Sequence, residues 1–533
     1  MKKILSIFLG GVMAFATVCM SGCNNKKIPD SEQTLQIYTY DAGYGTVWCD
    51  AVIQEFKNQD WVKEKYPNLE ILKPTYNDVA SFTAGQLNNG DRNTYDLMFG
   101  AGLTSYFGET GAVLDLTEVV YNTTVPGEDI SFAEKMNSSY KLSSRYLDVK
   151  NSSVEKYYFV PWAGGMGGII YNEDILNSFN LKVPNTTDEL LKVCETIMDN
   201  KGENNGKYNK GYSFLQARDA VEYFEYLLPI WWAQYEGVDR YLDFWNGIDN
   251  NRYSSNIFYQ QGRRYALEVM ATILDYEDGY LSPDSFNLEF MPSQLAFFNG
   301  NAVFHVNGDW LENEMRDLIK DKSDLATFKT MRTPVISELG VKLGITDLEL
   351  SALVDYIDGV GDKPAFVSTE GYTEEDVIEA VTEARSVVQS IGPNHHAVIP
   401  KHAKGKDVAV DFLRFLATDI AQKAYLKSTG GNNLPFAYNV KADCPELYNS
   451  FSPIHQSRID YFFNGSYETY TLPNERSFPL YIYGELAAFS NMNIYTTLSS
   501  STNTMTVDDF MQDTIDAWTA DKWDRALKAA GIK

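Results

Sequence analysis

The sequence predicts an α/β protein with two lobes, and three observations support this prediction. The chain has 533 residues, which is too many for one hydrophobic core, so two or more domains are expected. In the first ~100 residues, short β-rich runs alternate with helical patterns, which indicates βαβ units and a largely parallel sheet. Residues 160–165, a proline followed by glycines, break this alternation and predict a crossing between two lobes.

The elements expected in the first lobe follow in chain order. TLQIYTYD (34–41) is a β-rich run that ends in the turn sequence AGYG, and a helical pattern of apolar residues runs from Val47 to Trp61. LEILKPTYND and TYDLMFGAG are the next two predicted strands. Parallel sheets bind ligands beyond the carboxyl ends of their strands, so we expect the site near TYDAGYG, GAGLTSY and, further along the chain, NGDWLE.

The second lobe begins with a predicted strand, GGIIYN, and then a helix that Asn185, Thr186 or Thr187 can cap. An aromatic helix pattern runs from Tyr223 to Tyr235. Residues 336–390 are acidic and rich in helical patterns, which indicates an insertion in this lobe. The predicted boundaries place residues 34–160 and 400–440 in lobe 1 and residues 161–399 and 441–533 in lobe 2, with a second crossing near 395–399.

The N-terminus predicts export and a lipid anchor. A basic start, MKK, precedes an apolar stretch of about 15 residues, the length of a signal-peptide core and short for a membrane span. Ser21, Gly22 and Cys23 resemble the lipobox of bacterial lipoproteins, in which the peptide is cut before a cysteine that carries diacylglycerol. We therefore expect a signal peptide over residues 1–22, lipidation at Cys23 and a polar tether over residues 23–33.

The charge and the cysteines narrow the class of partner. The formal net charge of -27 and the pI of about 4.6 disfavour nucleic acid, which an acidic surface repels. Beyond Cys23 the chain keeps Cys49, Cys194 and Cys444, whose wide spacing fits neither a disulfide framework nor a zinc site. One disulfide among the three stays open.

Motifs of enzymes and metal sites are weak in this chain. The sequence contains no GxSxG elbow, no HExxH and no P-loop. His395, His396 and His402 form a local cluster, for which packing or hinge hydrogen bonds are a better explanation than a metal. Glycoside hydrolysis needs only two well-placed carboxylates, and nothing in the sequence points to such a pair. We expect no cofactor, no metal and no catalytic residue.

The aromatic residues favour a sugar ligand, because stacking on a ring buries the apolar C–H face of a sugar. For each aromatic residue alone, core packing is the more common role. Trp231 and its neighbour cannot share one face of a helix, so at least one of them is structural. The aromatic residues near predicted strand ends, the crossing or the helix after it are Tyr40, Trp162, Tyr226, Trp231, Trp232 and Trp310.

Four stretches together resemble one family. They are LQIYTYD, VPWAGGMGGIIYNEDIL, FFNGNAVFHVNGDWLENEM and the segment AVIPKHAKGKDVAVDFLRFLATDIAQKAYLKSTGGNNLP. In this order they resemble the opening strand, the hinge, the G.W segment and the closing helices of extracellular solute-binding proteins of bacterial ABC importers, in the branch that includes the maltodextrin-binding proteins. The resemblance implies a periplasmic-binding-protein-like (type II) fold, with a ligand cleft between two lobes that hinge crossings join.

The same resemblance assigns ligand-binding residues. It implies that Trp310 stacks on a sugar ring and that Asp309 either caps the next helix, with Glu312 completing a capping box, or accepts a hydroxyl hydrogen bond. It further places Tyr40 and Asp41 in the first cleft loop and Asn432 and Asn433 in a loop near the cleft. The aromatic candidates Trp162, Tyr226 and Trp232, taken from their positions in the sequence, complete the set of expected ligand-binding residues.

Two departures argue against a maltodextrin ligand. Maltodextrin binders carry a tryptophan and charged residues where this chain has 100–103, and a carboxylate where it has Gly164 and Gly165.

We therefore expect a monomeric, lipid-anchored binding protein on the extracellular or periplasmic face of the cell membrane. It would capture a sugar or oligosaccharide and deliver it to the permease subunits of an ABC transporter. The same fold binding a peptide, a polyamine or another small solute is one alternative, and a surface glycoside hydrolase is a less favoured one.

Anchoring is expected to depend on Cys23. Changing Cys23 to Ala removes the thiol that would carry the diacylglycerol, so the protein should be left uncleaved or be released from the membrane. Membrane fractionation with detection of incorporated fatty acid measures this. A Cys23→Ala protein that is still lipidated and retained like the parent contradicts the prediction.

Overall fold

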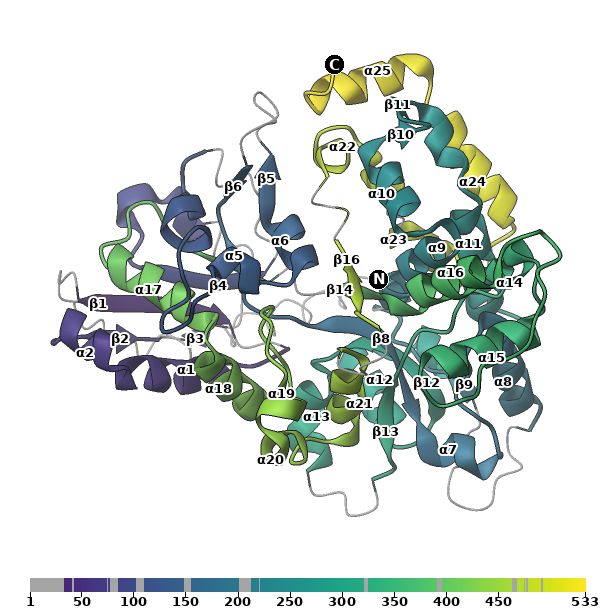
Figure 1. Cartoon of the computed structure of the whole chain (residues 1–533), viewed down its shortest axis with the longest axis horizontal. Helices are drawn as coiled ribbons and strands as arrows, with labels where there is room; N and C mark the ends of the chain where they lie inside the picture. Colours follow the sequence, from purple (N-terminus) through teal and green to yellow (C-terminus); the bar gives the residue numbers. More distant parts are fainter. Residues whose placement is uncertain are drawn as a thin grey trace, which may run out of the picture.

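The computed structural model describes residues 33–40, 43–73, 75–76, 85–101, 110–147, 155–200, 212–219, 221–320, 325–390, 395–462, 467–473, 475, 478–489 and 492–533. The predicted signal peptide, Cys23 and nearly all of the predicted tether lie outside these residues, as does Asp41. Within the described part, no helix has the length and apolar character needed to cross a membrane. The chain forms two lobes, each built around its own sheet (Figure 1).

The sheet of lobe 1 has the order β2-β1-β4-β15-β7, with β3 also beside β1. Strand β1 runs parallel to β2, β3 and β4, as predicted for βαβ units, whereas β15 runs antiparallel to both β4 and β7. The strands are β1 (Thr34–Tyr40), β2 (Glu70–Leu72), β3 (Thr75–Tyr76), β4 (Leu97–Ala101), β7 (Val160–Pro161) and β15 (His395–Val398). A separate hairpin-like pair, β5 (Arg145–Leu147) and β6 (Glu155–Tyr157), lies in the same lobe.

Helices from both ends of the chain cover the sheet of lobe 1. The helical pattern predicted from Val47 to Trp61 forms two helices, α1 and α2, that meet at Gln59. Val52 and Phe56 are buried as their spacing predicts, whereas Val47 is exposed and Trp48 is buried in its place. Helix α1 packs on α18 from the C-terminal half. The helical segments of this lobe are α1 (Val47–Asn58), α2 (Asp60–Lys65), η1 (Gly90–Arg92), η2 (Thr117–Tyr121), α5 (Phe132–Lys135), α6 (Ser138–Ser144), α17 (Lys406–Leu416), α18 (Asp419–Thr429), α19 (Val440–Asp443) and α20 (Pro445–Tyr448).

The sheet of lobe 2 has the order β16-β14-β8-β12-β9, and β13 also pairs with β8. This sheet is mixed, a point on which the sequence made no prediction: β8 runs antiparallel to β12, β13 and β14, whereas β12 runs parallel to β9 and β14 runs parallel to β16. Strand β8 enters the sheet directly from the crossing rather than through a βαβ unit. The strands are β8 (Met166–Asn172), β9 (Tyr212–Phe214), β12 (Ala302–Gly308), β13 (Phe328–Met331), β14 (Val387–Ser390) and β16 (Tyr470–Leu472).

A thick helical layer completes lobe 2. The predicted aromatic helix over 223–235 is divided into η3 and α9, because Pro229 lies in the first turn of α9 and starts a new helix there. Gly237, with φ of 89°, separates α9 from α10. The segments of this layer are α7 (Glu173–Ser178), α8 (Thr187–Asp199), η3 (Val221–Tyr226), α9 (Leu228–Glu236), α10 (Val238–Asn246), β10 (Ile248–Asp249), β11 (Arg252–Tyr253), η4 (Ser255–Tyr259), α11 (Gln261–Leu274), η5 (Pro283–Phe286), α12 (Phe290–Phe298) and α13 (Leu311–Ile319).

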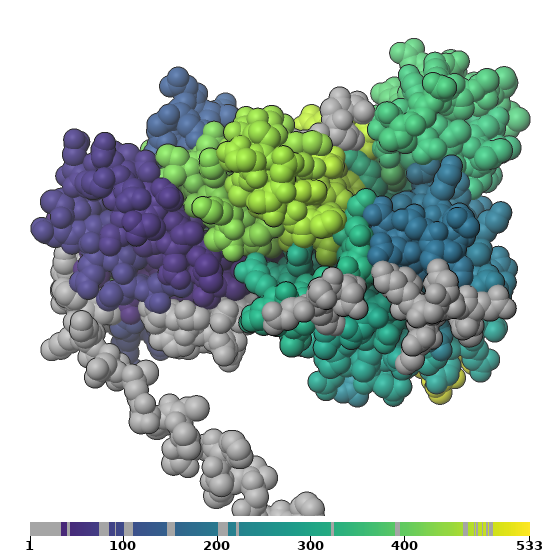
Figure 2. All heavy atoms as spheres, turned by 90° about the horizontal axis from the view of Figure 1, so that it is seen from below, coloured from purple at the N-terminus to yellow at the C-terminus, as the bar shows by residue number. Residues whose placement is uncertain are grey.

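The acidic stretch that sequence patterns predict as an insertion is helical. It contains α14 (Glu338–Leu343), α15 (Asp347–Ile357) and α16 (Glu374–Ser386), and α14 and α16 pack on α9. Figure 2 shows the green part of this stretch at one corner of lobe 2, away from lobe 1. The last segments are α21 (Pro453–Phe462), α22 (Pro479–Ile482), η8 (Leu486–Phe489), α23 (Met492–Leu498), α24 (Val507–Asp516) and α25 (Ala520–Ala529).

The order of the described elements requires the chain to pass between the lobes at three places. The first is at 162–165, between β7 and β8, where a crossing is predicted. The second lies between β14 and β15, at 391–394, outside the described residues; the strand pairing places His395–Val398 with lobe 1, so the boundary predicted at 399/400 moves to before His395. The third lies between α20 and α21, whereas the predicted boundary was at 440/441. Figure 2 shows the yellow-green segment that includes α18 to α21 between the two lobes.

The three cysteines among the described residues do not form a disulfide. Cys49, Cys194 and Cys444 are each free and buried, which answers the open question of a disulfide among them.

The fold of lobe 1 is expected to depend on Asp96. Its carboxylate accepts hydrogen bonds from the backbone N–H groups of Gln36, Lys404 and Gly405 at 2.8–2.9 Å, and so joins β1 to the start of α17. Changing Asp96 to Ala leaves buried donors without an acceptor, which costs about 1–3 kcal/mol of unfolding free energy. Urea unfolding followed by fluorescence measures this loss.

The matched control is Asp60→Ala, since Asp60 carries an exposed ion pair with Lys63. It should change the unfolding free energy by less than about 0.5 kcal/mol. Equal effects of the two substitutions would show that the buried acceptor has no special role.

Candidate ligand-binding site between the lobes

Trp310 follows the carboxyl end of β12, at the edge of the sheet that faces lobe 1. Gly308 lies beneath its indole, and a Cβ at that glycine would come within 2.6 Å of the ring carbons. The ring is 9% exposed, because Tyr44 of lobe 1 meets it edge-on at 6.0 Å and Tyr223 and His395 also lie against it. The tryptophan at the strand end is therefore the place where aromatic residues of the two lobes meet.

Asp309 does not cap the helix that follows it. The N-cap of α13 is Trp310, with no side-chain cap hydrogen bond, and Glu312 accepts from the Ser452 hydroxyl instead of completing a capping box. The cap role considered for Asp309 is thus wrong. Its carboxylate accepts a hydrogen bond of 2.6 Å from the Tyr44 hydroxyl and forms an ion pair with Arg458.

Arg458 on α21 is the centre of a buried polar cluster. Its guanidinium donates to Asp309, to the Asn432 side-chain oxygen at 2.8 Å and to the Gly431 carbonyl. Burial raises the pKa of the Asp309 carboxyl, and the charge of Arg458 and the Tyr44 hydroxyl oppose that rise. Burial and the charge of Asp309 raise the pKa of Tyr44 well above its ordinary value, so Tyr44 remains a hydroxyl donor at neutral pH.

The first crossing passes directly under this cluster. A Cβ at Gly165 would collide with the Tyr44 hydroxyl and with the Asp309 carboxylate, and a Cβ at Gly164 would collide with Asn433. The Gly164 N–H donates to the Asn433 carbonyl at 2.8 Å. The crossing therefore needs glycines for close approach, which sequence patterns alone had suggested only as looseness.

Trp162 belongs to the core of lobe 1 rather than to an open surface. Its ring stacks on Trp48 at 5.1 Å with an interplanar angle of 17°, and its indole N–H donates to the Gly100 carbonyl. Trp162 meets the interlobe cluster through near-perpendicular ring contacts with Tyr44 at 5.9 Å and with His395 at 4.9 Å.

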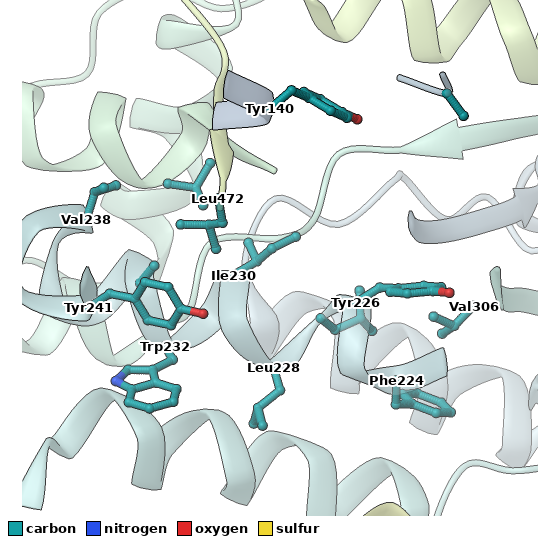
Figure 3. Close-up of a cluster of buried hydrophobic side chains, with 14 of the residues drawn as sticks. Tyr140, Phe224, Tyr226, Leu228, Ile230, Trp232, Val238, Tyr241, Val306 and Leu472 are labelled. Carbon is teal, nitrogen blue, oxygen red and sulfur yellow. The ribbon is translucent and has the colours of Figure 1, made fainter. Parts of the chain in front are cut away.

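Tyr226 and Trp232 lie in different places. Tyr226 packs over Gly167 of β8 and stacks on Tyr223 at 5.4 Å, so it lies near Trp310. Figure 3 shows Tyr226 beside Val306 and Trp232 apart from both, beside Tyr241. Trp232 is buried in the helical layer, where its indole N–H donates to Gln260. The structure therefore does not bring Trp232 to the lobe junction.

Four predicted site residues remain, two in the loop after α18 and two at the end of β1. Asn432 is buried and accepts from Arg458, and Asn433 is half-buried with its side chain donating to the Leu434 carbonyl. Tyr40 is the last residue of β1, and Asp41 lies outside the described residues. Trp310, Asp309, Asn432, Asn433, Trp162 and Tyr226 thus form one interlobe neighbourhood.

Sequence reasoning missed residues that complete this neighbourhood. Tyr44 was within the AGYG turn at a predicted strand end, so its position was the signal that could have identified it. Arg458 carried no such signal, because it lies in an ordinary helix far along the chain. His395 packs edge-on to Trp162 and Tyr44, and no group of three His, Cys, Asp or Glu suited to a metal occurs among the described residues.

The arrangement is suited to holding a ligand rather than to acid–base chemistry. Aromatic rings from both lobes converge on Trp310, while Asp309, the carboxylate beside it, is neutralised by an arginine. A stacking surface beside a carboxylate that is already paired fits an uncharged ligand with apolar faces.

Comparisons with known proteins agree with this geometry. The family model for "Bacterial extracellular solute-binding protein" matches residues 51–449. No curated protein sequence matches the chain.

Solved structures share the fold at low sequence identity. A protein from a work on xylan utilization by the thermophilic bacterium Caldanaerobius polysaccharolyticus superposes with a TM-score of 0.57 at 16% identity, over 91% of this chain and 100% of that one. RafE in complex with raffinose gives 0.53 at 12%, over 92% and 99%. Maltose-bound MalE3 of T. maritima gives 0.52 at 14%, over 91% and 98%.

The interlobe cluster is expected to make stability depend on pH through His455. Burial and the charges of Arg458 and Arg316 lower the pKa of His455 well below the ordinary 6.5, and Glu312 is its acidic neighbour. The unfolded chain takes up a proton near pH 6.5 while the folded chain does not. The folded state therefore loses up to about 1.4 kcal/mol per pH unit as the pH falls below 6.5.

The test compares the parent with His455→Gln by urea unfolding between pH 7.5 and 5.0. The parent should lose more stability than the variant over this range. His305, whose pKa burial lowers to about 4, is present in both proteins and cancels from the difference. Parallel stability curves would contradict a buried neutral His455.

Proposed function

Because the chain belongs to the bacterial extracellular solute-binding proteins, we propose that it binds an uncharged sugar or short oligosaccharide between its two lobes and delivers it to the permease of an ABC importer. The observation that supports this most is the position of Trp310 at the strand end, facing Tyr44 of the other lobe. Relatives in fold bind sugars, as raffinose-bound RafE and maltose-bound MalE3 do.

The charge balance of the site favours a sugar over a polyamine or another cation. A cationic ligand needs carboxylates that remain free to pair with it. Asp309 instead shares its two oxygens between Arg458 and Tyr44. Hydrogen bonds to sugar hydroxyls do not require a free carboxylate, because uncharged donors and acceptors satisfy them.

The crossing supports a ligand other than maltodextrin. The positions where maltodextrin binders carry a carboxylate are Gly164 and Gly165, and here even a Cβ would collide with Asn433, Tyr44 or Asp309. A glycan of different shape fits this departure. A glycoside hydrolase would need two free carboxylates, and Asp309 is already paired with Arg458. The family itself is one of binding proteins.

We further propose that the protein acts at the surface of the cell membrane. The apolar N-terminal stretch and Cys23 support a lipid anchor, so the two lobes would be held at the outer face of the cell membrane as a monomer near the permease.

The ligand can be found by a thermal-shift screen across neutral mono- and oligosaccharides, with polyamines and peptides as the competing classes. A ligand that binds only the folded protein must raise the melting temperature. Stabilisation by a polyamine or a peptide and by no sugar would replace the proposed ligand class.

Trp310→Ala is expected to weaken sugar binding about tenfold or more, because stacking of a large apolar ring is worth roughly 1.5–3 kcal/mol and 1.4 kcal/mol is one decade. Trp310→Phe should restore part of the affinity. Calorimetric titration measures both variants with the sugar that the screen identifies.

Trp232→Ala is the matched control, since this tryptophan is buried in the helical layer of the same lobe. It should lose about 3–5 kcal/mol of stability and keep near-normal affinity in the folded fraction. If Trp232→Ala rather than Trp310→Ala loses affinity, the ligand does not lie at the lobe junction.

A further inference from the structure

Two loops of lobe 1 make direct polar contacts with two helical segments of lobe 2. The loop at 43–44 contacts the start of α13, and the loop at 429–432 contacts α13 and α21. These contacts are Tyr44 hydroxyl to Asp309, Asn313 side-chain N–H to the Gly43 carbonyl, Arg316 to the Thr429 carbonyl, and Arg458 to Asn432 and the Gly431 carbonyl.

The contacts to Asp309 use both of its carboxylate oxygens, Oδ1 for Tyr44 and Oδ2 for Arg458, while Asn432 Nδ2 and Arg458 Nε in the same cluster are buried with no hydrogen-bond partner among the described residues. The Tyr44 hydroxyl donates its one proton to Asp309, and that carboxylate receives its second partner from Arg458. Tyr44, Asp309 and Arg458 are all buried. Parting the lobes at this point would break the Tyr44–Asp309 hydrogen bond and uncover one side of a buried ion pair.

Aromatic contacts also hold the two lobes together. The rings of Tyr44 and Trp310 are nearly perpendicular, with their centroids 6.0 Å apart. Gly43 also lies close to Trp310, because a Cβ added at Gly43 would be 3.7 Å from the Trp310 Cβ. The loop of lobe 1 therefore covers the proposed stacking surface while its polar atoms bind the residues on either side of it, Asp309 and Asn313.

We propose that Tyr44 and Arg458 are positioning residues that latch the two lobes together through Asp309, so that the closed arrangement is the main form of the protein without a ligand. Tyr44 reaches Asp309 from lobe 1, and Arg458 holds Asp309 while it grips the 431–432 loop of lobe 1. A ligand then enters only when the latch opens. This inference concerns the equilibrium between closed and open lobes, and it holds for whatever solute the site takes.

The free energy of one hydrogen bond determines how far a substitution should shift the equilibrium between closed and open lobes. A hydrogen bond between neutral groups contributes about 1 kcal/mol net, which is roughly a fivefold change in an equilibrium constant, and a bond to a carboxylate contributes more. Tyr44→Phe removes the bond to Asp309 but keeps the ring against Trp310. Asn313→Ala removes the bond to Gly43. The double variant should therefore raise the ratio of open to closed molecules by more than about fivefold.

Small-angle scattering of the ligand-free protein tests the latch without any knowledge of the ligand. The parent should have the radius of gyration of the closed structure, and the Tyr44→Phe/Asn313→Ala variant should have a larger one. A parent that already scatters as an open molecule, or a double variant that stays as compact as a closed parent, overturns the proposal.

The matched control is Tyr121→Phe, because the Tyr121 hydroxyl is also buried but donates to the Phe159 carbonyl within lobe 1. It should leave the radius of gyration unchanged. Urea unfolding of all the variants confirms that each is folded before scattering is compared.

Hydrogen exchange gives a second, local measurement. Backbone amides at the start of α13 and in the 429–432 loop should exchange about fivefold faster in Tyr44→Phe than in the parent, while those of β8 remain the same. A structural role of Tyr44 confined to lobe 1 would instead speed exchange in α1 and leave α13 unchanged. That result would overturn the latch even if scattering showed an expansion.

Discussion

The buried carboxylate of Asp309 is the constraint on which the architecture of the lobe junction depends. A carboxylate removed from water costs several kcal/mol unless it is paired and hydrogen-bonded. Arg458 and Tyr44 supply the pair and the hydrogen bond, and they come from a helix beyond the third crossing and from the first loop of the chain. Residues more than 400 positions apart must therefore meet at one point, over a crossing whose Gly165 leaves room for them.

The main features of the fold were predictable from the sequence because they depend on local patterns. Strand and helix alternation predicted the parallel strands around β1, and the proline and glycines at 160–165 predicted the first crossing. The direction of β8 was not predictable in this way. Its orientation depends on how the chain enters lobe 2, and a seven-residue buried strand has the same pattern in either direction.

The site was predictable only in part, for a related reason. The position of Trp310 at the lobe junction was predictable because it follows a strand end, where α/β sheets bind ligands. Asp309 looked like a helix cap because caps are local, whereas its real partners lie far along the chain. Trp232 looked like a site residue because an aromatic helix pattern does not distinguish a ring that faces a cleft from a ring packed between helices.

Gly308 has a consequence for how proteins of this kind diversify. The indole of Trp310 lies flat on a position without a side chain, so one codon change to alanine there would displace the ring without altering the tryptophan itself. In the proposed site, the preference for a solute would then be set by a residue that lies beneath the stacking ring. After gene duplication, a substitution at this glycine could change the ligand that the protein prefers while the residues that line its site stayed the same.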